Sequence, residues 1–188
     1  MKNTIFFYLL ILALATSSCT VFSVHPIYDA DNQPGDKRLT GIWKDTDDST
    51  SFVEIRAHKN FYTLIRWEDK DTIWYEAHYA KIGDYYYLDL FPLDRKPYQI
   101  DDQAIRNFLP FHTFVKLELD DRNAVVSMFD EDKLMQLFRQ NRIRLRHELM
   151  DDYVLITAST SDLQKFIMKY SASKDVFEAP STFIKISP

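Results

Sequence analysis

Alternation of apolar and polar side chains with a period of two residues is the feature that most constrains how this chain can fold. The alternating segments are rich in β-branched and aromatic residues, and turn-forming residues separate them, which is typical of strands joined by turns. The predicted strands are residues 40–45, 51–57, 61–67, 72–82, 85–92, 111–120, 124–129, 142–149, 153–159 and 181–187. Because most separators are short, we expect antiparallel hairpins rather than parallel strands joined by helices.

Two short helices are expected in the C-terminal third. The first begins after Asp130, whose side chain can cap it, and ends near Asn141. The second has a capping box of Ser161 and Gln164, followed by an apolar stripe at helical spacing. The predicted fold is therefore mostly β, an antiparallel meander of about nine or ten strands that closes, or nearly closes, into a barrel. Closure removes exposed strand edges, although a strongly curved open sheet would show the same pattern.

The N-terminal residues have the layout of a secretory signal sequence. Lys2 provides a positive start, residues 5–15 are apolar, and small residues precede Cys19. The apolar segment is shorter than the roughly 20 residues that a membrane-spanning helix needs. Cys19 is the only cysteine of the chain, so no disulfide is expected.

The residues before Cys19 resemble those of bacterial lipoprotein signals, with Thr16 where these signals usually have Leu. This resemblance implies that residues 1–18 are removed and that Cys19 carries a lipid anchor in a bacterial cell envelope, with the protein facing the periplasm. The alternative is a buried or free cysteine behind an ordinary signal sequence. Residues 19–38 contain two prolines and a glycine, which predicts a tether after the lipidated cysteine. Residues 39–188 have the length of a single domain.

The composition excludes several classes of function. The net charge is −5, which argues against a nucleic-acid partner. With only three glycines, the chain lacks the clusters that dinucleotide and phosphate-binding loops need, and no cofactor is predicted. The histidines lie far apart in the sequence, and no GxSxG motif is present. We therefore predict no closely spaced metal-ligand motif and a protein that is not an enzyme.

Two short motifs carry a further resemblance. Gly41 and Trp43, in "GIW" at the start of a predicted strand, are similar to the first strand of lipocalins and their calycin relatives. The likeness implies a barrel in which the glycine permits a close backbone approach and the tryptophan closes one end. Together with Cys19 and "GDYYYLDL" (83–90), the chain also resembles envelope lipoproteins of Bacteroidota-type bacteria, a group that implies no known activity.

One group of polar residues is a candidate ligand site. In a meander, Glu76 and His78 share a face of one strand, Asp89 lies on the next strand and His112 begins a third. If these side chains point into the barrel, they can hydrogen-bond the head group of a ligand or hold a metal ion. The alternative is that they point outward, or pair with one another as satisfied polar groups.

A second candidate is a basic stripe in this acidic chain. Arg142, Arg144 and Arg146 alternate along a predicted strand, and Arg139 precedes them. Alternate guanidinium groups can bind phosphate or carboxylate groups bidentately, on lipopolysaccharide or on a partner protein. The alternative is a solvated strand face that is paired with acidic neighbours. These acidic neighbours are Asp151, Asp152 and Glu118.

From these features we expect a binding module, an anchored barrel that holds a small apolar or amphipathic ligand in an aromatic lumen. The first alternative is an interaction protein with a packed barrel, whose outer arginine stripe docks an envelope protein or lipopolysaccharide. The second is an enzyme that uses the cluster of Glu76, His78, Asp89 and His112, and it has the least support. An open lumenal cavity favours the binding module, and a filled barrel with an exposed patch favours the interaction protein.

Overall fold

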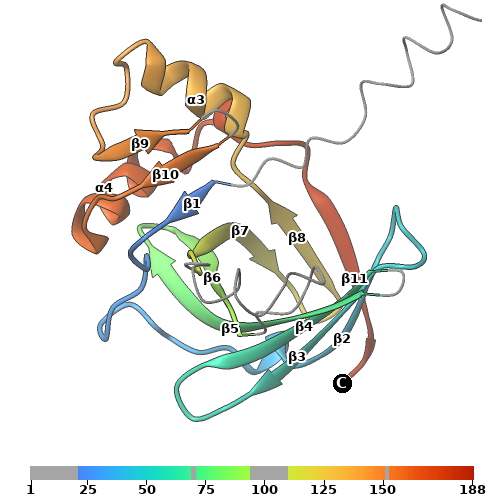
Figure 1. The fold of residues 1–188 in the computed structure, drawn as a ribbon. Coiled ribbons are helices and arrows are strands. Elements are labelled where there is room, and N and C mark those ends of the chain that lie inside the picture. Colours follow the sequence, from blue (N-terminus) through green and yellow to red (C-terminus); the bar gives the residue numbers. More distant parts are fainter. Residues whose placement is uncertain (1–20, 69–70, 94–109, 151–152) are drawn as a thin grey trace, which may run out of the picture.

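Eight strands form a closed antiparallel barrel in the computed structural model, which describes residues 21–68, 71–93, 110–150 and 153–188. The barrel strands are β2 (Gly41–Asp45), β3 (Phe52–Ala57), β4 (Tyr62–Glu68), β5 (Asp71–Ile82), β6 (Tyr85–Pro92), β7 (Thr113–Leu119), β8 (Asn123–Ser127) and β11 (Ser181–Ser187). Strands β2 to β8 pair in chain order, and β11 pairs with both β8 and β2 to close the ring (Figure 1). The predicted meander and its closure are confirmed.

The barrel has eight strands rather than the predicted nine or ten. The predicted strands over 142–149 and 153–159 lie outside it and are shorter, as β9 (His147–Leu149) and β10 (Val154–Ile156). With β1 (Phe22–Ser23) they form a separate sheet in the order β1-β10-β9, in which β1 runs parallel to β10. The sequence pattern could not assign strands to two sheets, because the side-chain period is two residues in both.

Alternate residues of the barrel strands pack together in the lumen. Cross-strand partners such as Ile55 and Leu64 share this inner face, and the rings of Tyr79 and Tyr86 stack there with centroids 5.2 Å apart. The buried side chains of this inner core are Leu39, Trp43, Ile55, Tyr62, Leu64, Ala77, Tyr79, Leu88, Val115, Leu117 and Ala124. Burial of this apolar and aromatic surface is the main stabilising contribution to the barrel.

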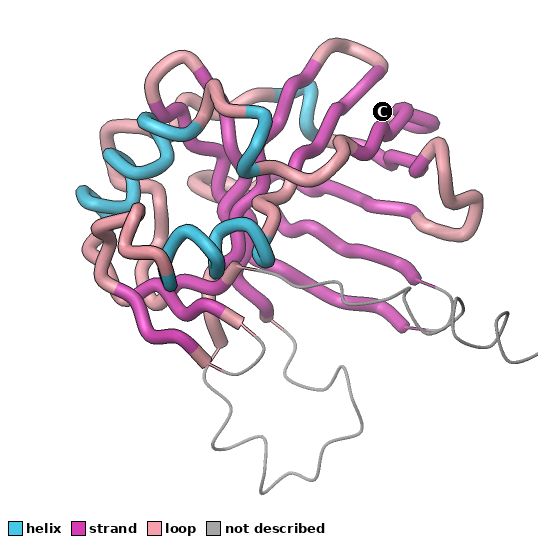
Figure 2. The backbone as a smooth tube through the Cα atoms, turned by 90° about the horizontal axis from the view of Figure 1, so that it is seen from above, coloured by secondary structure: helices cyan, strands magenta, loops and turns pink. Residues whose placement is uncertain are grey.

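A second hydrophobic core lies on the outer wall of the barrel. Ile82, Tyr87 and Phe114, on β5 to β7, pack with buried residues of the three-stranded sheet and of two helices, α3 (Glu131–Arg139) and α4 (Thr160–Tyr170). Figure 2 shows both helices on the same side of the barrel. Strands β5 to β7 therefore carry apolar side chains on both faces. Among the described residues, no helix has the length and apolarity needed to span a membrane.

Polar side chains cap both helices at their N-termini. Asp130 accepts a hydrogen bond from a backbone N–H of the first turn of α3, as the sequence predicts. In α4, the cap is Ser159, whose Oγ accepts from the backbone N–H of Asp162 at 3.3 Å. The predicted capping box of Ser161 and Gln164 is wrong, because Ser159 provides the same chemistry two residues earlier and the helix begins there.

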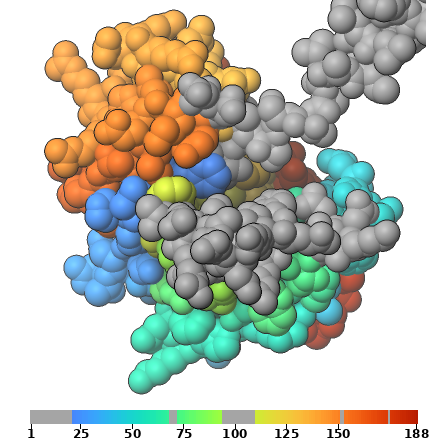
Figure 3. Space-filling view, viewed as in Figure 1, coloured from blue at the N-terminus to red at the C-terminus, as the bar shows by residue number. Residues whose placement is uncertain are grey.

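Residues 21–38, which the sequence assigns to a tether, lie against the folded core from Val21 onward. Val21, Ser23 and Ile27 are buried, and Ser23 exchanges two backbone hydrogen bonds of 2.9 Å with His112 beside the barrel. Figure 3 shows this segment, in blue, between the barrel strands and the C-terminal layer, which consists of α3, α4, β9 and β10. The segment that the sequence assigns to a tether is therefore packed against the fold from Val21 onward.

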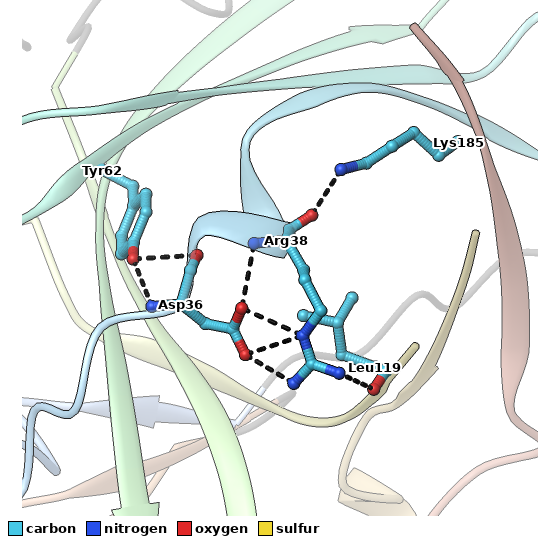
Figure 4. Close-up of polar contacts among 5 residues, drawn as sticks. All are labelled: Asp36, Arg38, Tyr62, Leu119 and Lys185. Atoms are coloured by element: carbon cyan, nitrogen blue, oxygen red, sulfur yellow. Dashed lines mark hydrogen bonds and ion pairs between the residues drawn. The ribbon is translucent and has the colours of Figure 1, made fainter. Parts of the chain in front are cut away.

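A 3₁₀ turn, η1 (Lys37–Leu39), crosses one end of the barrel (Figure 4). The backbone N–H of Asp36 donates to Tyr62 Oη at 2.8 Å, and Arg38 donates to the carbonyl oxygen of Leu119 at 3.3 Å. The Asp36 side chain caps the turn and pairs with the Arg38 guanidinium at 2.6 Å. The turn is thus fastened to strands on opposite sides of the barrel mouth.

Gly41 and Trp43 have the structural roles expected of them. Gly41 has a φ of +128°, and a Cβ at this position would clash with the carbonyl oxygen of Ser187 on β11, so only glycine permits this close approach. The Trp43 side chain is 2% exposed, and its indole N–H donates to the carbonyl oxygen of Leu39 at 2.8 Å. Lys185 Nζ lies 4.8 Å from the centroid of the Trp43 ring. Trp43 therefore fills the end of the barrel that η1 covers.

Candidate functional site

The polar cluster predicted from the sequence does form, but on the outer wall of the barrel. Glu76 and His78 lie on β5, Asp89 on β6 is the cross-strand partner of His78, and His112 immediately precedes β7. Ala77, between the two β5 residues, belongs to the lumenal core, so the four polar side chains point away from the lumen. Of the two orientations that the sequence allows, the outward one is found, and a lumenal site built from these residues is excluded.

His78 is held between β5 and the N-terminal segment. Its Nε2 lies 2.9 Å from Glu76 Oε1, and its Nδ1 lies 2.7 Å from Gln33 Oε1. The ring of Tyr28 stacks on the imidazole, with ring centroids 3.7 Å apart. Both nitrogens and one face of His78 therefore have partners within the chain, as expected of a structural histidine.

Asp89 is fully buried and joins the N-terminal segment to the barrel wall. Its Oδ1 accepts from His112 Nδ1 at 2.7 Å, and its Oδ2 accepts from the backbone N–H of Ile27 at 2.8 Å. Burial, and then the charges of Asp89 and Glu76, raise the pKa of Tyr28. Among the described residues, no His, Cys, Asp or Glu side chains are grouped so as to hold a metal ion. The cluster is thus a set of satisfied polar groups.

The arginine segment follows directly from the way α3 ends. Asn141 has a φ of +56°, and the N–H groups of Asn141 and Arg142 donate to carbonyl oxygens of the last helical turn at 2.9 Å. This arrangement satisfies the helix end and turns the chain sharply. Residues 142–146 are not part of a strand, and the chain bends at Leu145. The carbonyl oxygen of Arg146 accepts a hydrogen bond from the backbone N–H of Thr157 at 3.0 Å, just after the three-residue strand β10.

The side-chain alternation predicted for this segment is present even without strand pairing. Ile143 and Leu145 are buried in the outer core. The three exposed residues of the segment are Arg142, Arg144 and Arg146. All three arginines are therefore exposed, whereas the predicted strand begins only at His147.

Two adjoining depressions border the arginine segment: the first lies between residues 143–146 and α4, and the second lies between α3, Arg142 and the C-terminal end of α4. Their volumes are about 260 Å³ and about 390 Å³, and both are lined by Lys169 and Tyr170. Phe166, Ile143 and Leu145 provide apolar lining in the first. The cationic side chains lining the two depressions are Lys133, Arg142, Arg144, Arg146, Lys165 and Lys169. We refer to this surface, defined by the six cations, as the basic groove.

Few acidic side chains compensate the charge of the basic groove. Asp162 and Asp175 also line it, and Asp162 pairs with Lys165 at 3.0 Å. The hydrogen bond from Lys165 is the main reason that the pKa of Asp162 is lowered. Within the described ranges, no ion pair involves the three arginines. The groove therefore has a surplus of positive charge.

The acidic neighbours that the sequence offers as partners of the arginines are placed as follows. Glu118 lies 3.9 Å from Lys116 on β7 and pairs with that side chain. Asp151 and Asp152 lie outside the described residues. Pairing of the arginines with Glu118 is thus not found.

Sequence reasoning found the arginines but missed the contribution of α4. Lys165 and Lys169 are four residues apart, which places both on the same exposed face of the helix. That spacing was visible in the sequence, but nothing in a linear pattern shows that this face lies beside residues 144–146. Tertiary packing of α4 on the outer core brings the two basic elements together.

Cys19 lies outside the described residues, so its lipidation stays a prediction. Comparison of the chain with models of protein families, with curated proteins and with solved structures finds no match.

Proposed function

We propose that this protein is a lipid-anchored binding protein of the bacterial cell envelope, not an enzyme, and that it binds an anionic amphiphile in the basic groove. In this proposal Cys19 carries the anchor and the domain faces the periplasm. The observation that carries the binding function is the combination of a cationic rim with an apolar floor in a depression of about 260 Å³. A ligand with one anionic head group and one apolar part matches both features.

The distribution of charge supports a specific site rather than general attraction to anions. The whole chain has a net charge of −5, so it repels anions at long range. Arg144 and Arg146 can bind phosphate or carboxylate oxygens with paired donors, while Phe166, which is 6% exposed, forms part of the apolar floor. The second depression, about 390 Å³, falls within the range of small-molecule sites, about 300–1,000 Å³, and the first, about 260 Å³, lies just below it.

A lumenal ligand has less support. The four polar residues expected to hold its head group, Glu76, His78, Asp89 and His112, face the N-terminal segment instead, and the lumen contains the inner core. The strand order is nonetheless the up-and-down order of lipocalins, and we include a lipocalin-like fold in the proposal. On this view the barrel is a scaffold, and the layer on its outer wall does the binding.

The test of the groove uses the chain from residue 20 onward, which retains every described residue, and isothermal titration with dodecyl phosphate below its micelle concentration. A triple variant removes the groove arginines: Arg142→Ser, Arg144→Ser and Arg146→Ser. A matched control removes three exposed cations elsewhere: Lys37→Ser, Lys59→Ser and Arg122→Ser. We expect the groove variant to bind dodecyl phosphate at least about ten-fold more weakly, since charge-assisted hydrogen bonds are lost, and the control to bind like the parent. Equal affinity in all three proteins would refute the groove.

Two further titrations separate charge from apolar contact. Inorganic phosphate should bind more weakly than dodecyl phosphate, because it cannot use the apolar floor. Dodecyl maltoside, which has the same chain but no charge, should bind equally weakly to the parent and to the groove variant.

The anchor has its own test. In a bacterial host, Cys19→Ala should release the protein from the membrane fraction, because the sulfur that carries the lipid is gone. If the variant stays membrane-bound and its signal sequence is still processed at the same point, the anchor proposal fails.

A further inference from the structure

The first buried residue lies very close to the predicted anchor. Val21 is 5% exposed and β1 begins at Phe22, so only Thr20 separates Cys19 from the folded core. Three residues extend at most about 11 Å. If Cys19 is lipidated, β1 is therefore held next to the head groups of the bilayer. This step depends on the anchor proposed above.

The surface around β1 is apolar and partly aromatic. The Phe22 ring contacts the rings of Tyr153 and Phe111, with centroids 5.6 Å and 6.0 Å away. Val24 and Met150 are 44% and 40% exposed beside them. We call these five residues the N-terminal apolar face.

Among the described residues of this sheet, Glu148 is the charged side chain on the same side as Phe22, because Leu155 pairs with both of them, and it lies two strands away on β9. Arg146 precedes β9 and belongs to the basic groove. The part of this side that lies next to the predicted anchor, around β1, is therefore apolar.

We propose that the N-terminal apolar face docks on the lipid bilayer that holds the anchor. Aromatic side chains favour the level of the head groups, where an apolar ring and a polar edge are both accommodated. The short link leaves no room for another protein between β1 and the membrane, so the bilayer is the occupant that the geometry selects.

The experiment uses the lipidated full chain in phosphatidylcholine vesicles that contain a spin-labelled lipid. Cys19 is the only native cysteine and is blocked when lipidated, so a thiol-reactive fluorophore attaches only to an introduced cysteine. Met150→Cys places the fluorophore on the N-terminal apolar face. Met168→Cys is the matched control, because this methionine is 56% exposed and lies far from the N-terminal apolar face. It lies beside Gly83, at one end of the β6–β7 pair, whereas His112, which bonds to Ser23 of β1, lies at the other end.

We expect the spin-labelled lipid to quench the fluorophore at position 150 about two-fold or more, and to leave position 168 unquenched, because only the docked face reaches the acyl region. Vesicle-bound protein without quenching at position 150 would overturn the docking while leaving the anchor intact. A blue-shifted but unquenched signal that depends on protein concentration would also overturn it, in favour of a second copy on this face. Fluorophore on Cys19 of the unsubstituted chain, with no binding to vesicles, would overturn the anchor as well.

Discussion

Replacing Asp89 by alanine tests whether the polar cluster on the outer wall is structural. The substitution removes a buried carboxylate that accepts hydrogen bonds of 2.7 Å and 2.8 Å from His112 and from the backbone N–H of Ile27. Both donors would be left without their acceptor. Breaking a buried, hydrogen-bonded pair by removing one partner costs about 3–5 kcal/mol. We therefore expect the free energy of unfolding of Asp89→Ala to fall by about this amount.

Urea unfolding followed by tryptophan fluorescence measures the effect, since the three tryptophans lie on barrel strands. Asp89→Asn retains an oxygen acceptor for the Ile27 N–H, so its loss should be clearly smaller than that of the alanine variant. Asp84→Ala, at the exposed turn after β5, should unfold like the parent. If the free energy of unfolding of Asp89→Ala is within about 1 kcal/mol of the parent value, the structural role is refuted and a binding role for the cluster is favoured.

Three further predictions concern single residues of the barrel. Gly41→Ala should lower the free energy of unfolding by at least about 2 kcal/mol, because the Cβ meets the backbone of Ser187; urea unfolding checks this, and an unchanged midpoint contradicts it. Burial raises the pKa of Tyr87 to about 12 from 10, so the stability that depends on its protonated form is complete below pH 10 and is lost as the pH rises toward 12. Tyr87→Phe should therefore lose less stability than the parent between those pH values, and parallel profiles would refute the reasoning. The hydrogen bond from Arg38 lowers the pKa of Asp36, so this carboxylate stabilises the fold above its unfolded pKa and loses its effect as the pH falls. The stability difference between the parent and Asp36→Asn should shrink in acid, and a constant difference from pH 7 to pH 3 would exclude the effect.

Most of the barrel could be predicted from the sequence because neighbouring strands in the barrel are also neighbours along the chain. Alternation within each strand and short separators such as Gly83-Asp84 are enough to specify hairpins between successive strands. Only the last barrel strand, residues 181–187, pairs with strands that are distant in the sequence. Closure could still be expected, because an open sheet would leave two strand edges unpaired.

The orientation of the polar cluster could not be predicted in the same way. His78 and Asp89 alternate with Ala77 and Leu88, so the pattern shows which residues share a face but not which face is the lumen. The usual rule that the polar face points to solvent gives no answer, because the outer wall of β5 to β7 is itself covered. Recognising that cover requires the packing of residues 21–33 and of the C-terminal layer, which are not adjacent to these strands in the sequence.

The packing of the predicted tether and the composition of the basic groove could not be predicted for the same reason, because both depend on contacts between segments that are distant in the sequence. Pro26 and Pro34 predicted a tether, but the packing of Ile27 depends on an acceptor on β6, far along the chain. The arginines were visible as a charged stripe, whereas the lysines of α4 join them only through the tertiary fold.

The placement of β11 has a consequence for the order in which the molecule folds. Lys185 bonds to the carbonyl oxygen of Arg38 across 147 residues of sequence, and Gln164 bonds to that of Ile27 across 137. The hairpins between neighbouring strands can form early, but the barrel cannot close until its last strand is available. Such distant contacts slow folding and leave the edges of β2 and β8 open in the meantime. A chaperone that covers strand edges would therefore have its greatest effect on the yield before β11 pairs.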